Sequence, residues 1–76
     1  MDGARRWEQR QRTFGLQVAA LRHERGLSQE QLADASGLHR TYIGQVEGGH
    51  RNVALRNIYR LVDALGMTVG RLCDRT

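Results

Sequence analysis

Glycines divide this chain into short segments, and no proline interrupts any of them. Within each segment the apolar residues recur three and four positions apart, which places them along one side of a helix. Phe14 and Val18 begin such a pattern, and Gly26 would end the helix in a left-handed conformation. The start of this helix has two alternatives: it reaches back to about Ala4, or residues 1–12 form a separate basic arm.

Two short helices with a tight turn between them are predicted next. Ser28 is a good N-cap and Gln31 completes the capping-box pattern, so a helix begins here and ends near Gly37. The glycine supplies the backbone conformation that such a turn needs. Ala33 is small enough to let the two helices cross closely. The second of them extends from about residue 39 or 40 to Glu47.

A longer helix and a final short one complete the predicted fold. The apolar spacing of the longer helix involves Leu55, Ile58, Leu61, Val62 and Leu65, and Gly66 ends it. The final helix extends from about Thr68 to Cys73. The sequence therefore predicts an all-α fold, a compact bundle of five helices.

Basic residues are concentrated in the middle of the chain. Residues 39–60 hold four arginines against one acidic residue, a net charge of +3, whereas the whole chain has +4. A basic segment between more neutral ones is typical of a surface that contacts phosphates, and the alternative is an ordinary solvated charged face. All twelve Lys and Arg positions hold arginine, a side chain suited to bidentate phosphate and guanine contacts, although the absence of lysine is better explained by genomic base composition.

Several other classes of function are not indicated. No Ser/His/Asp or paired-carboxylate arrangement is present, so the chain is not predicted to be an enzyme. The three histidines and Cys73 fit no zinc spacing, and we expect neither a metal nor another cofactor. No apolar run is long enough to span a bilayer, and none follows the N-terminal charges as in a secretory signal. A cytoplasmic protein without membrane partners is expected.

The segment from Leu27 to Gly66 resembles the phage-repressor and Cro (Xre-type) helix-turn-helix family. The resemblance rests on the Ser-Gln-x-x-Leu-Ala start of the motif and its Glu-Gly end, and with the first helix it covers most of the chain. Within the family, Arg-Thr-Tyr-Ile and the later Arg-Asn-Val-Ala-Leu are most similar to controller proteins of restriction–modification systems. Many family members have a proline where this chain has Val53, a difference that concerns the path of the loop.

The resemblance implies a role for particular residues. Residues 13–73 would form a DNA-binding and dimerisation domain, with residues 1–12 as a basic arm or helix extension. The residues implied to face base edges are Arg40, Thr41, Tyr42 and Gln45; those implied to contact phosphates are Gln29, Arg51 and Asn52. Arg22 and Glu47 would form a structural ion pair. The implied dimer contacts are Leu65, Val69 and Leu72.

The function implied is sequence-specific binding of double-stranded DNA by a homodimer at a pseudo-palindromic operator. Such a regulator represses or activates nearby genes, its own included, and needs no small-molecule effector. Two alternatives stay open: an antitoxin that neutralises a partner toxin and binds DNA secondarily, and an adaptor that binds another protein. Tyr42 is equally compatible with a half-buried packing role, and Arg56 and Arg60 are predicted to be solvated.

Overall fold

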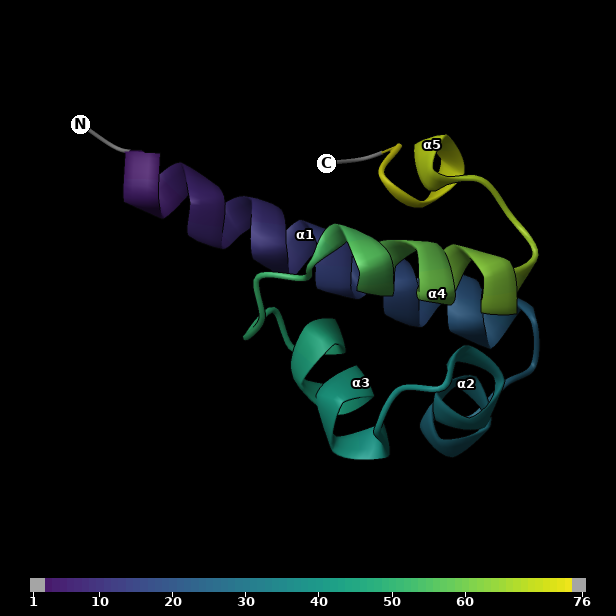
Figure 1. Cartoon of the computed structure of the whole chain (residues 1–76). Helices are drawn as coiled ribbons and strands as arrows, with labels where there is room; N and C mark the ends of the chain where they lie inside the picture. The colour runs from purple at the N-terminus through teal and green to yellow at the C-terminus, as the bar shows by residue number, and fades with distance from the viewer. Residues whose placement is uncertain (1–2, 75–76) are drawn as a thin grey trace.

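The computed structural model describes residues 3–74, which fold into five α-helices joined by short turns (Figure 1). The helices are α1 (Gly3–Glu24), α2 (Gln29–Ser36), α3 (Arg40–Glu47), α4 (Leu55–Leu65) and α5 (Val69–Leu72). The described residues contain no strand, and the predicted all-α architecture of five helices is confirmed.

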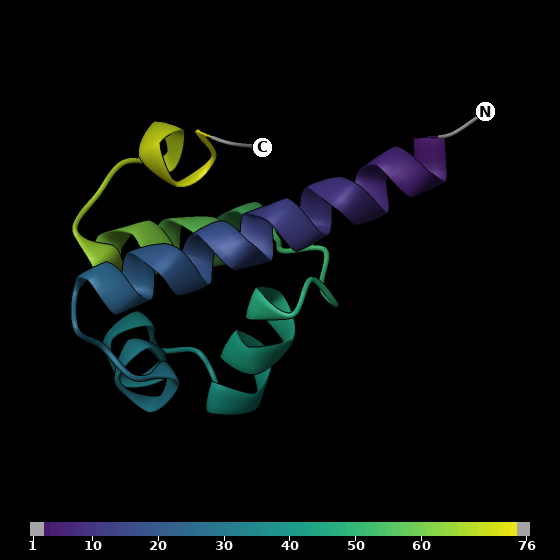
Figure 2. The ribbon, with the colours of Figure 1, turned by 180° about the vertical axis from the view of Figure 1, so that it is seen from behind.

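The helices α2 and α3 lie on one side of α1 and α4, and α5 lies on the other side (Figures 1 and 2). The N-terminal part of α1 projects beyond the other helices. A helix of 22 residues is roughly 33 Å long, which accounts for the longest dimension of 39 Å against 24 and 21 Å. Residues 3–12 therefore extend α1, in agreement with the alternative of a helix that reaches back to about Ala4; Met1 and Asp2 lie outside the described residues.

Local sequence signals set the ends of the short helices. The Ser28 hydroxyl accepts a hydrogen bond from the backbone N–H of Gln31 at 3.0 Å, and the Gln31 side chain accepts one from the backbone N–H of Ser28 at 2.8 Å. This reciprocal pair is the predicted capping box. Gly37 has a φ of 75° and provides the left-handed turn between α2 and α3, as the sequence predicts.

The core lies where α1, α2, α3, α4 and α5 face one another. Its buried apolar residues are Val18, Leu21, Leu32, Ala33, Ile43, Val46, Leu61, Val62, Leu65 and Leu72. The predicted inward face of α4 is confirmed except at its first residue, because Leu55 is 65% exposed. No buried side-chain nitrogen or oxygen within residues 3–74 lacks a hydrogen-bond partner.

A close backbone approach fixes α1 against α3. Gly15 lies in the middle of α1 and is buried. A Cβ atom added there would fall on the carbonyl oxygen of Val46 and lie 2.7 Å from that of Glu47. Because both obstacles are backbone atoms, α3 can approach α1 this closely only where the side chain is absent.

A partly buried ion pair joins the same two helices. The guanidinium of Arg22 donates from Nε to one carboxylate oxygen of Glu47 at 2.7 Å and from Nη2 to the other at 3.0 Å. Only 9% and 7% of the two side chains are exposed. A third bond connects Arg22 Nη1 to the carbonyl oxygen of Leu27 at 2.8 Å, and the bonds to Glu47 raise the pKa of Arg22 above its ordinary value.

We expect Glu47→Ala to lower the free energy of unfolding by about 3–5 kcal/mol, because it leaves the buried guanidinium of Arg22 uncompensated. The matched control is Glu24→Ala, which removes a 3.9 Å pair with Arg71 whose side chains are more than half exposed. That change should cost about 1 kcal/mol or less. Urea unfolding of both variants measures the difference. Equal losses would contradict a structural role for the buried pair.

Gly15→Ala should lower the free energy of unfolding by about 3 kcal/mol, because the methyl group forces the backbones of α1 and α3 apart. Gly44→Ala is the control, since a Cβ at that helical position would make only an ordinary contact, 3.8 Å from the Gln29 side chain. There the better helix propensity of alanine should raise stability by about 0.5–1 kcal/mol. Opposite signs in thermal unfolding are expected; a stabilised Gly15→Ala variant would exclude the close approach.

Candidate nucleic-acid interface

The first turn of α3 lies at the outer edge of the molecule, away from α1 and α4 (Figure 1). Its buried residues, Ile43 and Val46, hold the helix against the core, while Arg40 and Thr41 are exposed. The other end of α3 is fixed by the ion pair of Glu47. The arrangement presents the N-terminal turn of α3 to a partner and keeps its C-terminal turn inside the fold, as the helix-turn-helix prediction requires.

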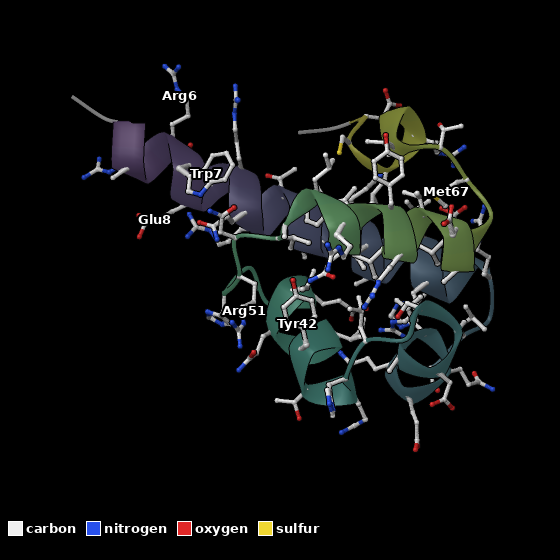
Figure 3. All side chains as sticks on the ribbon, viewed as in Figure 1. Arg6, Trp7, Glu8, Tyr42, Arg51 and Met67 are labelled. Carbon is white, nitrogen blue, oxygen red and sulfur yellow. The ribbon has the colours of Figure 1, made fainter. Side chains whose placement is uncertain are left out.

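Tyr42 has the half-buried packing role, one of the two that the sequence left open. Tyr42 is partly buried and packs against the core. Its hydroxyl oxygen accepts a hydrogen bond from Asn57 Nδ2 on α4 at 3.1 Å. The guanidinium carbon of Arg51 lies 5.3 Å from the centre of the ring, a cation–π distance (Figure 3). One aromatic ring thus connects α3 with α4 and with the loop that joins them.

Gln45 is also held by Arg51. The Nε–H group of Arg51 donates to Gln45 Oε1 at 2.8 Å. This bond leaves both N–H groups of the Gln45 amide available on that side of α3. The terminal nitrogens of Arg51 are not used by the bond to Gln45, and the residue is exposed.

These residues surround one open hollow. Its lining consists of Gly37, Leu38, His39, Thr41, Tyr42, Gln45, Arg51, Asn57 and Arg60. Arg60 is exposed, in line with its predicted solvation, and it also lines the hollow beside the predicted reading residues. Sequence reasoning did not identify Asn57. The only sign of Asn57 in the sequence is that it is a polar residue directly before the apolar Ile58, in a helix that is otherwise basic on its polar side.

Of the predicted phosphate contacts, Arg51 lines this hollow, whereas Gln29 and Asn52 do not. Gln29 begins α2, and its Nε2 donates to Glu47 Oε1 at 3.0 Å. The N–H group of Gln31 donates to Ser28, so the N–H groups of Gln29 and Glu30 are the ones that this end of α2 can offer to an anion. Arg51 and Asn52 are exposed in the loop between α3 and α4. Gln29 contacts α3 through Glu47, and Arg51 contacts it through Gln45.

The local charge favours an anionic partner. Glu47 is the only acidic residue between residues 39 and 60, and it is paired with Arg22. It therefore does not neutralise Arg40, Arg51 or Arg60, all of which are exposed. Three uncompensated guanidinium groups around one helix produce the positive potential that a phosphate backbone requires.

The three residues predicted as dimer contacts are largely covered by the chain itself. Leu65 and Leu72 are buried in the core of the chain itself, and Val69 packs partly buried against that core. Within residues 3–74 the large apolar side chains that remain exposed are different ones: Trp7, Leu16, Leu55 and Tyr59. Leu55 and Tyr59 are four positions apart on α4, whereas Trp7 lies on the projecting part of α1 (Figure 3).

Residues 3–74 provide neither a metal cluster nor a membrane-spanning helix. No group of three or more His, Cys, Asp or Glu side chains in this range could hold a metal ion. No helix formed by these residues is long and apolar enough to cross a membrane.

The chain is similar to known proteins over most of its length. Residues 18–72 match the helix-turn-helix family profile. The control protein C.SmaI of Serratia marcescens is 52% identical over 58 residues, which cover 76% of this chain and 69% of that protein. The control protein C.BamHI of Bacillus amyloliquefaciens is 45% identical over 64 residues, covering 83% of this chain and 79% of that protein.

A solved structure shares the fold. The restriction-modification controller protein C.AhdI from Aeromonas hydrophila superimposes with a TM-score of 0.79 at 49% identity, over 80% of this chain and 92% of that one. Both the profile and the relatives belong to DNA-binding regulators, which are not a family of enzymes. The chain therefore belongs to the phage-repressor and Cro (Xre-type) helix-turn-helix family of DNA-binding transcription regulators.

Proposed function

We propose that this protein is a controller of restriction–modification genes that binds a pseudo-palindromic operator as a homodimer and regulates its own gene. The observation that carries the proposal is the exposed first turn of α3, surrounded by arginines and held at its other end by a buried ion pair. The similarity to C.SmaI, C.BamHI and C.AhdI supports the particular class of regulator. A regulator of this kind works in the cytoplasm, with its DNA, and responds to its own concentration.

In this proposal the first turn of α3 reads base edges in the major groove. Arg40 donates two hydrogen bonds to one guanine, and Thr41 offers its methyl group to thymine or its hydroxyl to a base. Gln45 acts first as a donor, because its Oε1 already accepts from Arg51. It therefore favours an acceptor such as guanine O6 or N7, instead of the paired donor and acceptor that adenine offers.

The backbone contacts in this proposal come from both sides of α3. Gln29 uses its second amide proton and the free N–H groups at the start of α2 to bind one phosphate. Arg51 binds another through its terminal nitrogens, and Asn52 assists it. These contacts orient the protein but carry no information on sequence.

We propose that the dimer forms through the outer face of α4, with a second copy of this chain as the occupant. Leu55 and Tyr59 lie exposed there, and Ile58 between them borders an apolar groove that Trp7 and Phe14 also line. A symmetric operator has two half-sites, so a second recognition helix has to come from a second chain. A face formed by α4 leaves the first turn of α3 open in both copies.

Removing Arg40 should reduce discrimination between DNA sequences. Arg40→Ala is expected to weaken binding to a duplex selected from a random library by about 1–3 kcal/mol more than binding to its scrambled version, because only the guanine contact depends on sequence. Arg56→Ala is the control, since it removes the same charge from an exposed site outside the hollow. It should weaken both duplexes equally. Fluorescence anisotropy titrations measure, for each variant, the ratio of its affinities for the selected and the scrambled duplex. If Arg40→Ala leaves this ratio at the wild-type value, Arg40 contacts a phosphate and not a base.

A charge on the outer face of α4 should prevent dimerisation. Tyr59→Glu is expected to sediment at the monomer mass at micromolar concentration, where the wild-type protein sediments at twice that mass, because two buried carboxylates would face each other across the symmetry axis. Leu16→Glu is the matched control: Leu16 is also exposed, but it lies on α1 outside this face, and the variant should stay dimeric. A dimeric Tyr59→Glu variant would place the interface elsewhere.

A further inference from the structure

A chain of contacts links the predicted reading residues of α3 to a residue that lies outside the helix-turn-helix motif. Asn57 on α4 donates from Nδ2 to the hydroxyl oxygen of Tyr42 at 3.1 Å. The Tyr42 ring lies 5.3 Å from the guanidinium of Arg51, and Arg51 donates to Gln45 at 2.8 Å. Asn57, Tyr42, Gln45 and Arg51 all line the same hollow. Of these four residues, Asn57 is the only one on α4.

The direction of the first bond determines what Tyr42 can offer. A phenol has one proton and an oxygen with two lone pairs. Because Asn57 donates to that oxygen, the hydroxyl proton does not point at Asn57 and is available to another acceptor, and Tyr42 itself lines the hollow. Tyr42 is thereby oriented as a donor toward any acceptor that enters. The partly buried position of both residues limits the other orientations that the ring and hydroxyl would sample in open solvent.

We infer that Asn57 is a positioning residue for DNA recognition: by holding the hydroxyl oxygen of Tyr42 from α4, it orients the Tyr42 proton toward an acceptor on a base edge. The inference rests on the proposed DNA-binding function and adds a residue to it. Asn57 touches no base in this arrangement. It reduces the freedom of the group that does, and of the Arg51 guanidinium that stacks on the same ring.

Two other roles for Asn57 give different experimental results. A direct contact with phosphate would strengthen binding to every sequence alike. A purely structural bond between α3 and α4 would change stability and leave the preference among sequences unchanged. The ratio of the affinities for a selected and a scrambled duplex separates these roles from positioning.

The test is a double-mutant cycle of Asn57→Ala and Tyr42→Phe, measured as that ratio. Tyr42→Phe should lower the ratio about tenfold, and Asn57→Ala about two- to tenfold, the range expected for one hydrogen bond. In the Tyr42→Phe background, Asn57→Ala should change the ratio no further, because Asn57 acts through the hydroxyl that is already absent. Asn57→Ser, whose side chain is too short to reach the oxygen, provides a second variant should the alanine variant not fold.

Asn52→Ala is the matched control. It makes the same substitution at an exposed loop residue proposed to contact phosphate, and it should weaken both duplexes equally. A second measurement needs no DNA: in the free protein, Tyr42→Phe should shift the NMR signals of the Asn57 side-chain amide and leave those of Asn52 in place. Unmoved Asn57 signals would exclude the contact.

The outcomes distinguish this inference from the proposed function. Additive effects in the cycle, or equal weakening of binding to both duplexes by Asn57→Ala, would overturn the positioning role. Selective binding by the wild-type protein would in that case still support the proposed regulator function. A wild-type protein that bound every duplex with the same affinity would overturn both. The inference is supported if Asn57→Ala lowers the ratio of the two affinities in the protein that has Tyr42 and leaves it unchanged in the Tyr42→Phe background.

Discussion

The carboxylate of Glu47 joins three helices, and the position of α3 depends on it. It ends α3, accepts two hydrogen bonds from Arg22 on α1 and a third from Gln29 on α2. Gly15 allows α1 to approach the same turn of α3 without an intervening side chain. The C-terminal end of α3 is therefore fixed in the interior, and its N-terminal turn extends outward from that fixed point. A site that must match the spacing of base edges within fractions of an ångström requires such support.

Most of the fold could be predicted from local signals. The capping box at Ser28, the left-handed Gly37 and the apolar spacing are properties of neighbouring residues, so the sequence alone reveals them. What local spacing does not reveal is which element covers an apolar side chain. Leu65 and Leu72 were expected on a partner-facing surface but are covered by the chain itself, whereas Leu55 follows the same periodicity and is exposed, since no other helix covers the start of α4.

The residues of the candidate site likewise fall into those that the sequence predicts and those that only the packing reveals. The residues of the first turn of α3 follow from their place in the motif and from the resemblance. Asn57 and Arg60 could not be predicted, because their nearness to Tyr42 depends on how α4 packs rather than on sequence distance. Gly15 did carry a signal: a glycine inside a helix reduces its stability, so its presence between Phe14 and Val18 required a reason in the packing.

The division of α3 into an outer turn and an anchored turn has a consequence for how such a regulator can evolve. Arg40 and Thr41 make no contribution to the core, so substitutions there can alter the DNA sequence that is preferred while the fold persists. Glu47 and Gly15 tolerate no comparable variation. Gene duplication followed by changes in the outer turn would give two regulators with separate operators on one scaffold. Tyr42 limits this freedom, since its ring serves the core and the exposed surface together.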